Sequence, residues 1–191
     1  AGANQDYVYA GTSETTDVKL SRIVHRDAVG KTTLSFKGFL RKSNNYIDDS
    51  EVLTQRRQVS GWEMQIAQRQ AIGAGTVEGS LTYKRGTGAF GALPAPEERF
   101  GEGTSRMHLV LADANVQWPF KVADQAVTYS GQLRGQYNRT PLTPQDRFAI
   151  GGRFTVRGFD GLSVLSAARG WLMRNEWITD VMPGHKAYAA L

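Results

Sequence analysis

The feature of this sequence that most constrains its fold is a two-residue alternation of apolar and polar side chains. It is clearest over 127–138, where apolar or small residues occupy every odd position and polar residues every even position. Successive side chains of a β-strand point to opposite faces of the sheet, so the pattern predicts strands with one apolar and one polar face. Helical periodicity is nearly absent. The chain is therefore expected to be all-β and antiparallel.

The alternation recurs, with more noise near the amino-terminal end, and predicts about eight strands. They are expected at 16–26, 31–42, 58–70, 75–85, 107–118, 126–138, 170–179 and 185–191. Most of these runs are about ten residues long, which is the length of a tilted strand that crosses a bilayer. Strands of soluble proteins are usually nearer five or six residues.

The connections between the expected strands alternate in length. Short turns are expected at 27–30, 73–75, 119–124 and 183–184, and long polar loops at 43–57, 86–106 and 139–168. Short turns at one end and long loops at the other are typical of an outer-membrane β-barrel. Aromatic residues near strand ends suit the two membrane interfaces; these are Tyr83, Trp118, Tyr137, Trp171 and Trp177.

Two soluble folds also satisfy the alternation, namely a β-sandwich and an eight-stranded lipocalin-like barrel. In both, the apolar face packs inward and the charged face meets water. Strand length and loop asymmetry favour the membrane barrel, in which the polar face is turned inward. The polar-face residues then expected to line a hydrated pore are Lys37, Arg41, Glu78, Lys84, Arg134, Arg174 and Glu176.

Composition excludes several other classes of protein. The chain has no cysteine, so neither a disulfide framework nor a thiolate zinc site can form. The formal net charge is +5, but the basic residues are scattered rather than clustered, so nucleic acid is not an expected partner. No apolar run approaches the roughly 20 residues that a membrane helix requires.

Motifs for cofactors, metals and catalysis are weak. The glycine spacing of 86–91 matches a dinucleotide fingerprint, but a proline-containing segment follows it instead of a helix. His25, His108 and His185 lie on separate segments, and the acidic run 48–51 is typical of a solvated loop. No Gly-x-Ser-x-Gly motif is present. We therefore expect no cofactor, no metal site and no enzymatic activity.

The long loop contains Val156-Arg157-Gly158-Phe159 within a glycine-rich stretch, and strand motifs accompany it. Arg169-Gly170-Trp171 and Arg174-Asn175-Glu176 follow it, and 43–49 and 83–88 precede it. Together these stretches resemble the two-partner secretion transporters (the TpsB family of haemolysin activators and filamentous-haemagglutinin exporters), which belong to the outer-membrane assembly superfamily. The resemblance covers essentially the whole chain.

The resemblance implies that 1–191 is an internal part of one sixteen-stranded barrel domain, whose periplasmic domains lie outside this chain. It also implies that the extracellular loop 139–168 folds back into the lumen, where Arg157 pairs with an acid of the inner wall. That acid is expected near or beyond Leu191; Glu176 and Asp180 are present, but neither is assigned to this role. Physically, Gly158 permits a sharp turn, Arg157 offers a planar fork of donors to a carboxylate, and Phe159 can pack beside the pair.

The function implied is a pore in the bacterial outer membrane that exports a large partner protein without ATP. The partner is an adhesin, a haemolysin or a contact-dependent toxin, bound unfolded through its N-terminal secretion domain. The barrel is expected to be monomeric and surrounded by outer-membrane lipid. A passive porin-like channel is the alternative, and a soluble β-barrel binding protein is a third possibility.

Overall fold

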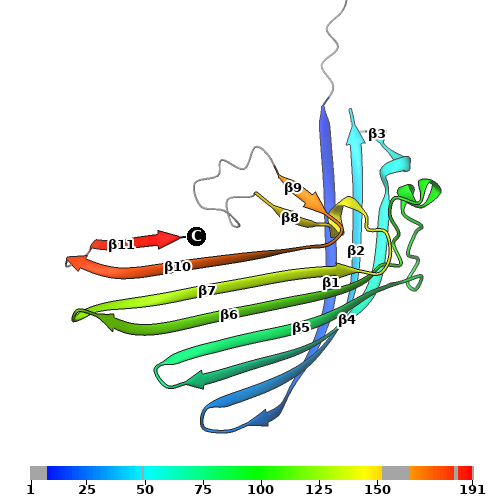
Figure 1. Ribbon diagram of the computed structural model, residues 1–191. Helices are drawn as coiled ribbons and strands as arrows, with labels where there is room; N and C mark the ends of the chain where they lie inside the picture. Colours follow the sequence, from blue (N-terminus) through cyan, green and yellow to red (C-terminus); the bar gives the residue numbers. More distant parts are fainter. Residues whose placement is uncertain (1–7, 49, 152–163, 183–184, 191) are drawn as a thin grey trace, which may run out of the picture.

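A computed structural model of the chain describes residues 8–48, 50–151, 164–182 and 185–190, and most of them lie in one large, strongly curved β-sheet (Figure 1). Eight strands follow one another across it: β1 (Tyr9–Arg26), β2 (Gly30–Ile47), β4 (Arg57–Ile72), β5 (Gly75–Thr87), β6 (His108–Val122), β7 (Gln125–Asn138), β10 (Gly170–Met182) and β11 (His185–Ala190). Three short strands, β3 (Ser50–Glu51), β8 (Phe148–Ile150) and β9 (Leu165–Ala167), belong to the loops. The loops also contain the 3-10 turns η1 (Leu53–Gln55), η2 (Pro96–Phe100) and η3 (Pro144–Asp146).

The sheet is an up-and-down meander, in which each long strand pairs antiparallel with the next long strand along the chain. The expected all-β, antiparallel architecture with eight long strands is confirmed. β1 and β11 lie at the two edges, so the described sheet is part of a barrel wall rather than a closed barrel. No helix within the described ranges is long and apolar enough to cross a bilayer.

The strands are longer than the sequence predicted, and one predicted turn is wrong. Residues 119–122 continue β6, and the chain reverses at Ala123 and Asp124, whose φ angles are 46° and 66°. Pro119 was expected to end the strand. Proline has no backbone N–H to donate to a neighbouring strand. Pro119 is tolerated because β5 pairs with β6 only as far as Gln117, so that edge of β6 has no neighbouring strand at Pro119.

The register places apolar side chains on the convex face of the sheet. One cross-strand row runs Leu34–Ile66–Leu81–Ala112–Gly135–Trp171. Leu81 and Leu133 on this face are 52% and 45% exposed, so these side chains do not converge on a core. Trp62 lies between Phe36 and Tyr83, with ring centroids 6.1 and 5.5 Å away.

Two tyrosine hydroxyls on the convex face have polar partners on neighbouring strands. The Tyr129 hydroxyl donates a hydrogen bond of 2.7 Å to Asn175 Oδ1, and the Tyr129 ring lies 5.5 Å from that of Trp177. The Tyr83 hydroxyl lies 3.0 Å from His108 Nδ1. Aromatic rings whose polar tips are hydrogen-bonded suit the boundary between hydrocarbon and water.

The small hydrophobic core lies on the concave side, at the end of the sheet that carries the long loops. Val59, Met107, Leu109 and Leu142 are almost fully buried there, and Phe39 packs against them. Phe39 interrupts the polar face of β2 because it fills the space over Gly61 on the neighbouring strand, where a Cβ would lie 2.6 Å from the Phe39 ring. This core joins the inner wall to the loop segment that contains Leu142.

A charge placed on the convex face is expected to block membrane assembly, whereas the same charge on the concave face is tolerated. Leu81→Lys puts an ammonium group against hydrocarbon, which costs about 2–4 kcal/mol near the bilayer midplane. Ser80→Lys is the matched control, because Ser80 lies on the concave face opposite Asp113. Assembly of the full-length variants into vesicles, followed by heat-modifiable gel mobility, measures the difference. Equal assembly of the two variants would contradict this assignment of the faces.

Candidate functional site

The seven residues predicted to line a pore all lie on the concave face of the sheet. Their register positions alternate with those of the convex apolar rows, and each has a polar neighbour across the strands. The structure brings Arg41 and Lys84 together near the long loops, while Glu78, Arg134, Arg174 and Glu176 lie further along the trough. That these residues line a pore remains a prediction.

Several cations of the concave face are paired with carboxylates, mostly on neighbouring strands. Lys37 Nζ lies 2.8 Å from Glu63 Oε2, and Arg69 Nε lies 3.2 Å from Glu78 Oε1. Arg134 Nε lies 3.4 Å from Asp113 Oδ1, and Arg174 Nε lies 3.6 Å from Glu176 Oε1. The Arg69–Glu78 and Arg134–Asp113 pairs are about half exposed, and exposed pairs of this kind add little stability. Their consequence is a hydrated wall on which positive and negative charges alternate over short distances.

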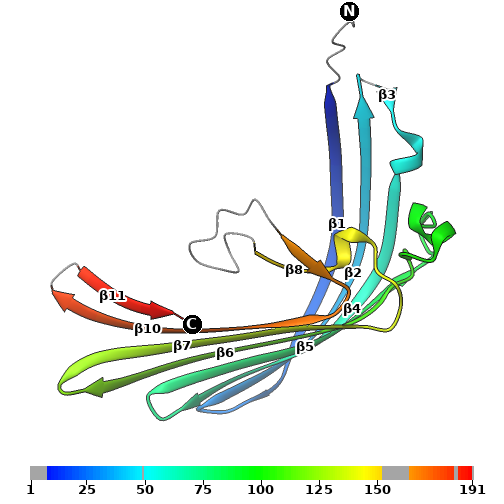
Figure 2. The ribbon, with the colours of Figure 1, turned by 45° about the horizontal axis from the view of Figure 1, so that its top comes forward.

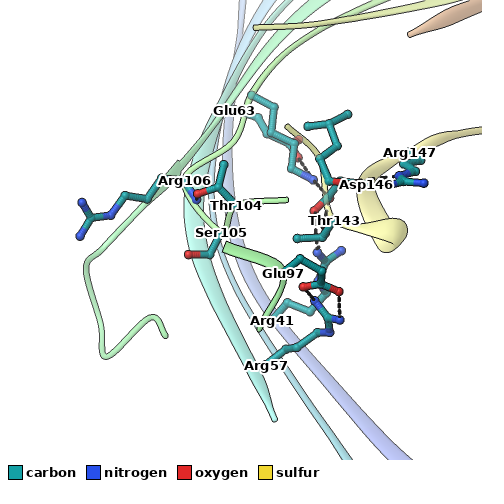
Figure 3. Close-up of polar contacts among 12 residues, drawn as sticks. Arg41, Arg57, Glu63, Glu97, Thr104, Ser105, Arg106, Thr143, Asp146 and Arg147 are labelled. Carbon is teal, nitrogen blue, oxygen red and sulfur yellow. Dashed lines mark hydrogen bonds and ion pairs between the residues drawn. The ribbon is translucent and has the colours of Figure 1, made fainter. Parts of the chain in front are cut away.

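The most buried ionic group of the site is Asp146, in η3 at the start of the long loop. Its side chain is 3% exposed and accepts hydrogen bonds from Arg41 Nη2 at 3.2 Å and from Thr143 Oγ1 at 3.0 Å. Lys84 Nζ lies 3.4 Å from the other carboxylate oxygen. Figure 3 shows Arg41 directed towards Asp146 from the wall, and Thr143 beside it in the loop. Lys84 approaches Asp146 from β5. The loop thus contributes the acid, and the wall contributes the bases.

Backbone contacts and apolar packing support the same segment. Gln136 Nε2 donates to the Asp146 carbonyl at 2.9 Å, and Thr104 N donates to the Pro141 carbonyl at 3.3 Å. Leu142 is 1% exposed in the small core. The segment from 141 to 148 is therefore held between the inner wall and the neighbouring loop, and it directs the chain over the concave side.

β8 and β9 continue from this anchor as a short antiparallel ladder, with Phe148 opposite Ala167 and Ile150 opposite Leu165. Figure 2 shows the pair lying within the concave side of the sheet. Phe148 packs over Gly170, where a Cβ would lie 2.9 Å from the ring. The motif Val156-Arg157-Gly158-Phe159 lies between β8 and β9 in the sequence but outside the described residues.

A second loop anchor lies beside the first (Figure 3). Arg57 holds the Glu97 carboxylate with both terminal nitrogens, and its Nη1–Oε2 distance is 2.8 Å. The hydrogen bonds from Arg57 hold the pKa of Glu97 below its ordinary value. This pair joins the start of β4 to η2, so two of the long loops are tied together at the mouth of the trough.

Several of these residues were not predicted from the sequence. Asp146 and Glu97 lie in irregular loops, where no periodicity indicates the direction of a side chain. The alternation is irregular in the strand that contains Glu63, but it does place Glu63 on the polar face. It did not indicate that Glu63 would pair with Lys37 and lie 3.8 Å from Lys84 Nζ. In the described part of the chain, no group of three or more His, Asp or Glu side chains could hold a metal ion.

The geometry of the sheet and its loop is that of one class of protein. A curved sheet of long antiparallel strands has an apolar convex face, an ion-paired concave face and a long loop anchored inside the curve. In a closed structure of this kind the apolar face meets lipid and the polar face encloses water, as in the wall of an outer-membrane β-barrel.

Comparison with known proteins agrees with this class. The model of the family "Haemolysin secretion/activation protein ShlB/FhaC/HecB" matches residues 1–191. The chain is 31% identical over 192 residues to outer membrane transporter CdiB-2 of Burkholderia pseudomallei, and 28% identical over 166 residues to outer membrane transporter CdiB of Dickeya dadantii. These alignments cover 100% and 87% of the chain. The chain belongs to the ShlB/FhaC/HecB family of two-partner secretion transporters.

Solved structures show the same relationship. CdiB from Acinetobacter baumannii superposes with a TM-score of 0.86 at 32% identity over the whole chain. CdiB from Escherichia coli superposes over 94% of the chain with a TM-score of 0.82 at 22% identity, which supports the fold alone. The chain spans 33% of the length of CdiB-2 and 33% of each solved chain. The expected family, outer-membrane location and part-barrel fold are confirmed.

Neutralising Asp146 is expected to release the start of the long loop. In Asp146→Asn, Arg41 and Lys84 lose their shared carboxylate, and hydrogen bonds to a charged group contribute about 2 kcal/mol. We expect amide hydrogen exchange over 142–148 to accelerate about 30-fold, since local opening follows local stability. Asp124→Asn, in the exposed turn at the opposite end, is the control. Unchanged exchange in Asp146→Asn would show that apolar packing alone holds the loop.

The Arg57–Glu97 pair is expected to weaken in acid. The pKa of Glu97 is lowered in the folded protein, so its contribution is present above the ordinary value of 4.5 and is lost as the pH falls through the folded value. Amide exchange over 96–100, corrected for its intrinsic pH dependence, should rise between about pH 6 and pH 3. Glu97→Gln should show weaker protection already at the higher pH and a smaller change on acidification. An identical pH response in the two proteins would argue against this role.

Proposed function

We propose that this chain forms part of the wall of an outer-membrane pore that exports a large partner protein in an unfolded state and without ATP. Residues 1–191 belong to one barrel domain, with 139–168 as an extracellular loop. The partner is an adhesin, a haemolysin or a contact-dependent toxin. The observation that carries the proposal is a loop anchored by Asp146 on the inner side of an ion-paired polar wall.

The inner wall has the chemistry that a passing polypeptide requires. Between the ion pairs lie hydroxyl and amide side chains, including Ser35, Gln65, Thr82, Asn115 and Gln132. Each can exchange hydrogen bonds with backbone groups or with water at little net cost. Because the pore-lining cations named above are already paired with carboxylates, a sliding chain meets many weak contacts with them and no single strong one. Lys37, Arg41, Glu78, Lys84, Arg134, Arg174 and Glu176 line this pore.

The signature loop regulates access to that pore. Arg157 pairs with a carboxylate on the inner wall, while Val156, Gly158 and Phe159 shape and cover the tip. Glu176 is a suitable acid within the described wall, because it faces the concave side, is 5% exposed and lies beside Arg174. Removing one partner of such a buried pair leaves the other charge uncompensated, which makes the loop position sensitive to either residue.

Partner recognition takes place on periplasmic domains outside this chain. They bind the N-terminal secretion domain of the unfolded partner and deliver it to the barrel, which acts as a monomer surrounded by outer-membrane lipid. The relatives carry the name outer membrane transporter, which supports transport as the activity of the whole protein. Neither nucleic acid nor a cofactor takes part in this mechanism.

Arg157→Ala is expected to leave insertion largely intact but to reduce export of the partner at least ten-fold, since the loop loses its charged contact. The full-length variant is tested by quantifying the partner protein in the culture medium and the barrel in the membrane fraction. Arg99→Ala is the control, because Arg99 is an exposed loop arginine without an ion pair among the described residues. Normal secretion by Arg157→Ala would count against the proposed role.

A passive porin-like channel would have the same wall but would not need the signature loop. Single-channel recording combined with the secretion assay distinguishes the two functions. An exporter is expected to lose secretion in Arg157→Ala whether or not its ion conductance changes. A passive channel would conduct ions and secrete no partner even in its unmodified form.

A further inference from the structure

Four exposed arginines lie at the long-loop end of four neighbouring strands, on the convex face of the sheet. Arg85 is near the end of β5, Arg106 just precedes β6, Arg139 just follows β7 and Arg169 just precedes β10. β5, β6, β7 and β10 are consecutive in the sheet. Neighbouring strands lie about 5 Å apart, so the four residues form a row along one rim of the convex face.

Contacts place each arginine of this rim row on the convex side. Arg85 pairs in register with Trp62 and His108, and the Arg139 amide donates to the His108 carbonyl at 3.0 Å. The Arg169 guanidinium lies 5.8 Å from the centre of the Tyr137 ring, which projects from the convex face. Figure 3 shows Arg106 pointing away from the Asp146 cluster, on the other side of the wall.

The rim row differs from the pore-lining cations named above in having no acidic partners. Every pore-lining cation described above lies within 4 Å of a carboxylate. Among the residues that the structure describes, none of the four rim arginines has an ion pair. On the convex face of β5, β6, β7 and β10, the described register contains no acidic residue at all. The described residues therefore supply no acidic partner for these four arginines.

Aromatic residues fix the level of the rim row relative to the membrane. Trp62, Tyr83, Tyr137 and Trp171 lie on the convex face beside the arginines, and Leu81, Leu133 and Met173 follow further along the strands. Aromatic side chains of membrane barrels lie at headgroup level, with the hydrocarbon band beyond them. The arginines consequently lie among the lipid headgroups, with their apolar stems along the surface and their charges towards water.

We propose that Arg85, Arg106, Arg139 and Arg169 form a binding site for a phosphorylated glycolipid of the leaflet at the long-loop end. The guanidinium fork binds phosphate oxygens in pairs, which favours phosphate over other anionic groups. A row of four such forks on adjacent strands suits a headgroup that carries more than one phosphate. The proposal rests on the outer-membrane barrel and not on the export activity.

The test compares the full-length protein with R85Q/R106Q/R139Q/R169Q and with a control that loses equal charge at the short-turn end. The control is R22Q/R26Q/K31Q/K121Q, whose substituted residues are exposed and have no ion pairs within the described ranges. Each protein, shown to be folded by heat-modifiable mobility, is titrated in detergent with diphosphorylated lipid A, its dephosphorylated form, phosphatidylglycerol and inorganic phosphate. Native mass spectrometry measures the bound fraction.

We expect the unmodified protein and the control to bind diphosphorylated lipid A at least ten-fold more tightly than the rim variant, with weak binding of the other three probes. Equal binding by the rim variant would overturn the proposal. Equal affinity for phosphatidylglycerol or inorganic phosphate would overturn it as well, by showing an unselective basic surface. If the quadruple variant does not fold, R139Q/R169Q takes its place, with R22Q/R26Q as control. The measurement contains no secretion step, so failure of export does not affect its outcome.

Discussion

In a continuous antiparallel sheet, residues that are paired across strands point to the same face, and successive residues of each strand alternate between the two faces. Here the ladder runs from β1 to β11, so one chemical character dominates each face of the sheet across most of its width. Rows such as Leu34–Ile66–Leu81 have no buried partner on the convex side, and rows such as Lys37–Glu63–Lys84 face inward. Lipid outside and water inside are the solvents that satisfy both faces, and the remaining features follow from that division.

The treatment of charge follows the same division. On the concave face, carboxylates on adjacent strands pair with several of the cations, which leaves those parts of the wall polar but electrically balanced over short distances. On the convex face, arginines occur on β5, β6, β7 and β10 only at the rim and lack acidic neighbours among the described residues. A pore that passes a polypeptide benefits from the first arrangement, because a deep electrostatic well would trap the chain. A rim that contacts phosphorylated headgroups benefits from the second.

The long loop connects this wall to function. At Asp146 the loop supplies the acid, while Arg41 and Lys84 of the wall supply the cations. Leu142 and Phe148 pack on either side of this contact, so the loop enters the concave side at a defined position. The Arg57–Glu97 pair ties neighbouring loops together at the same mouth. The anchor therefore limits where the signature motif can lie, which is the physical basis for expecting export to depend on it.

Local patterns in the sequence were sufficient for the strands, their faces and the family resemblance, because alternation with a period of two is a property of each strand alone. They placed Lys37, Lys84 and Arg134 on the polar side and expected Leu81 and Leu133 on the apolar one. They could not show that Pro119 lies within β6, since its tolerance depends on where β5 stops. Nor could they find Asp146 or Glu97, whose partners lie 105 and 40 residues away in sequence. The sequence by itself determined which face of each strand is polar; only the tertiary structure decided which loop acids meet which wall cations, because curvature of the sheet and packing of Leu142 bring those distant segments together.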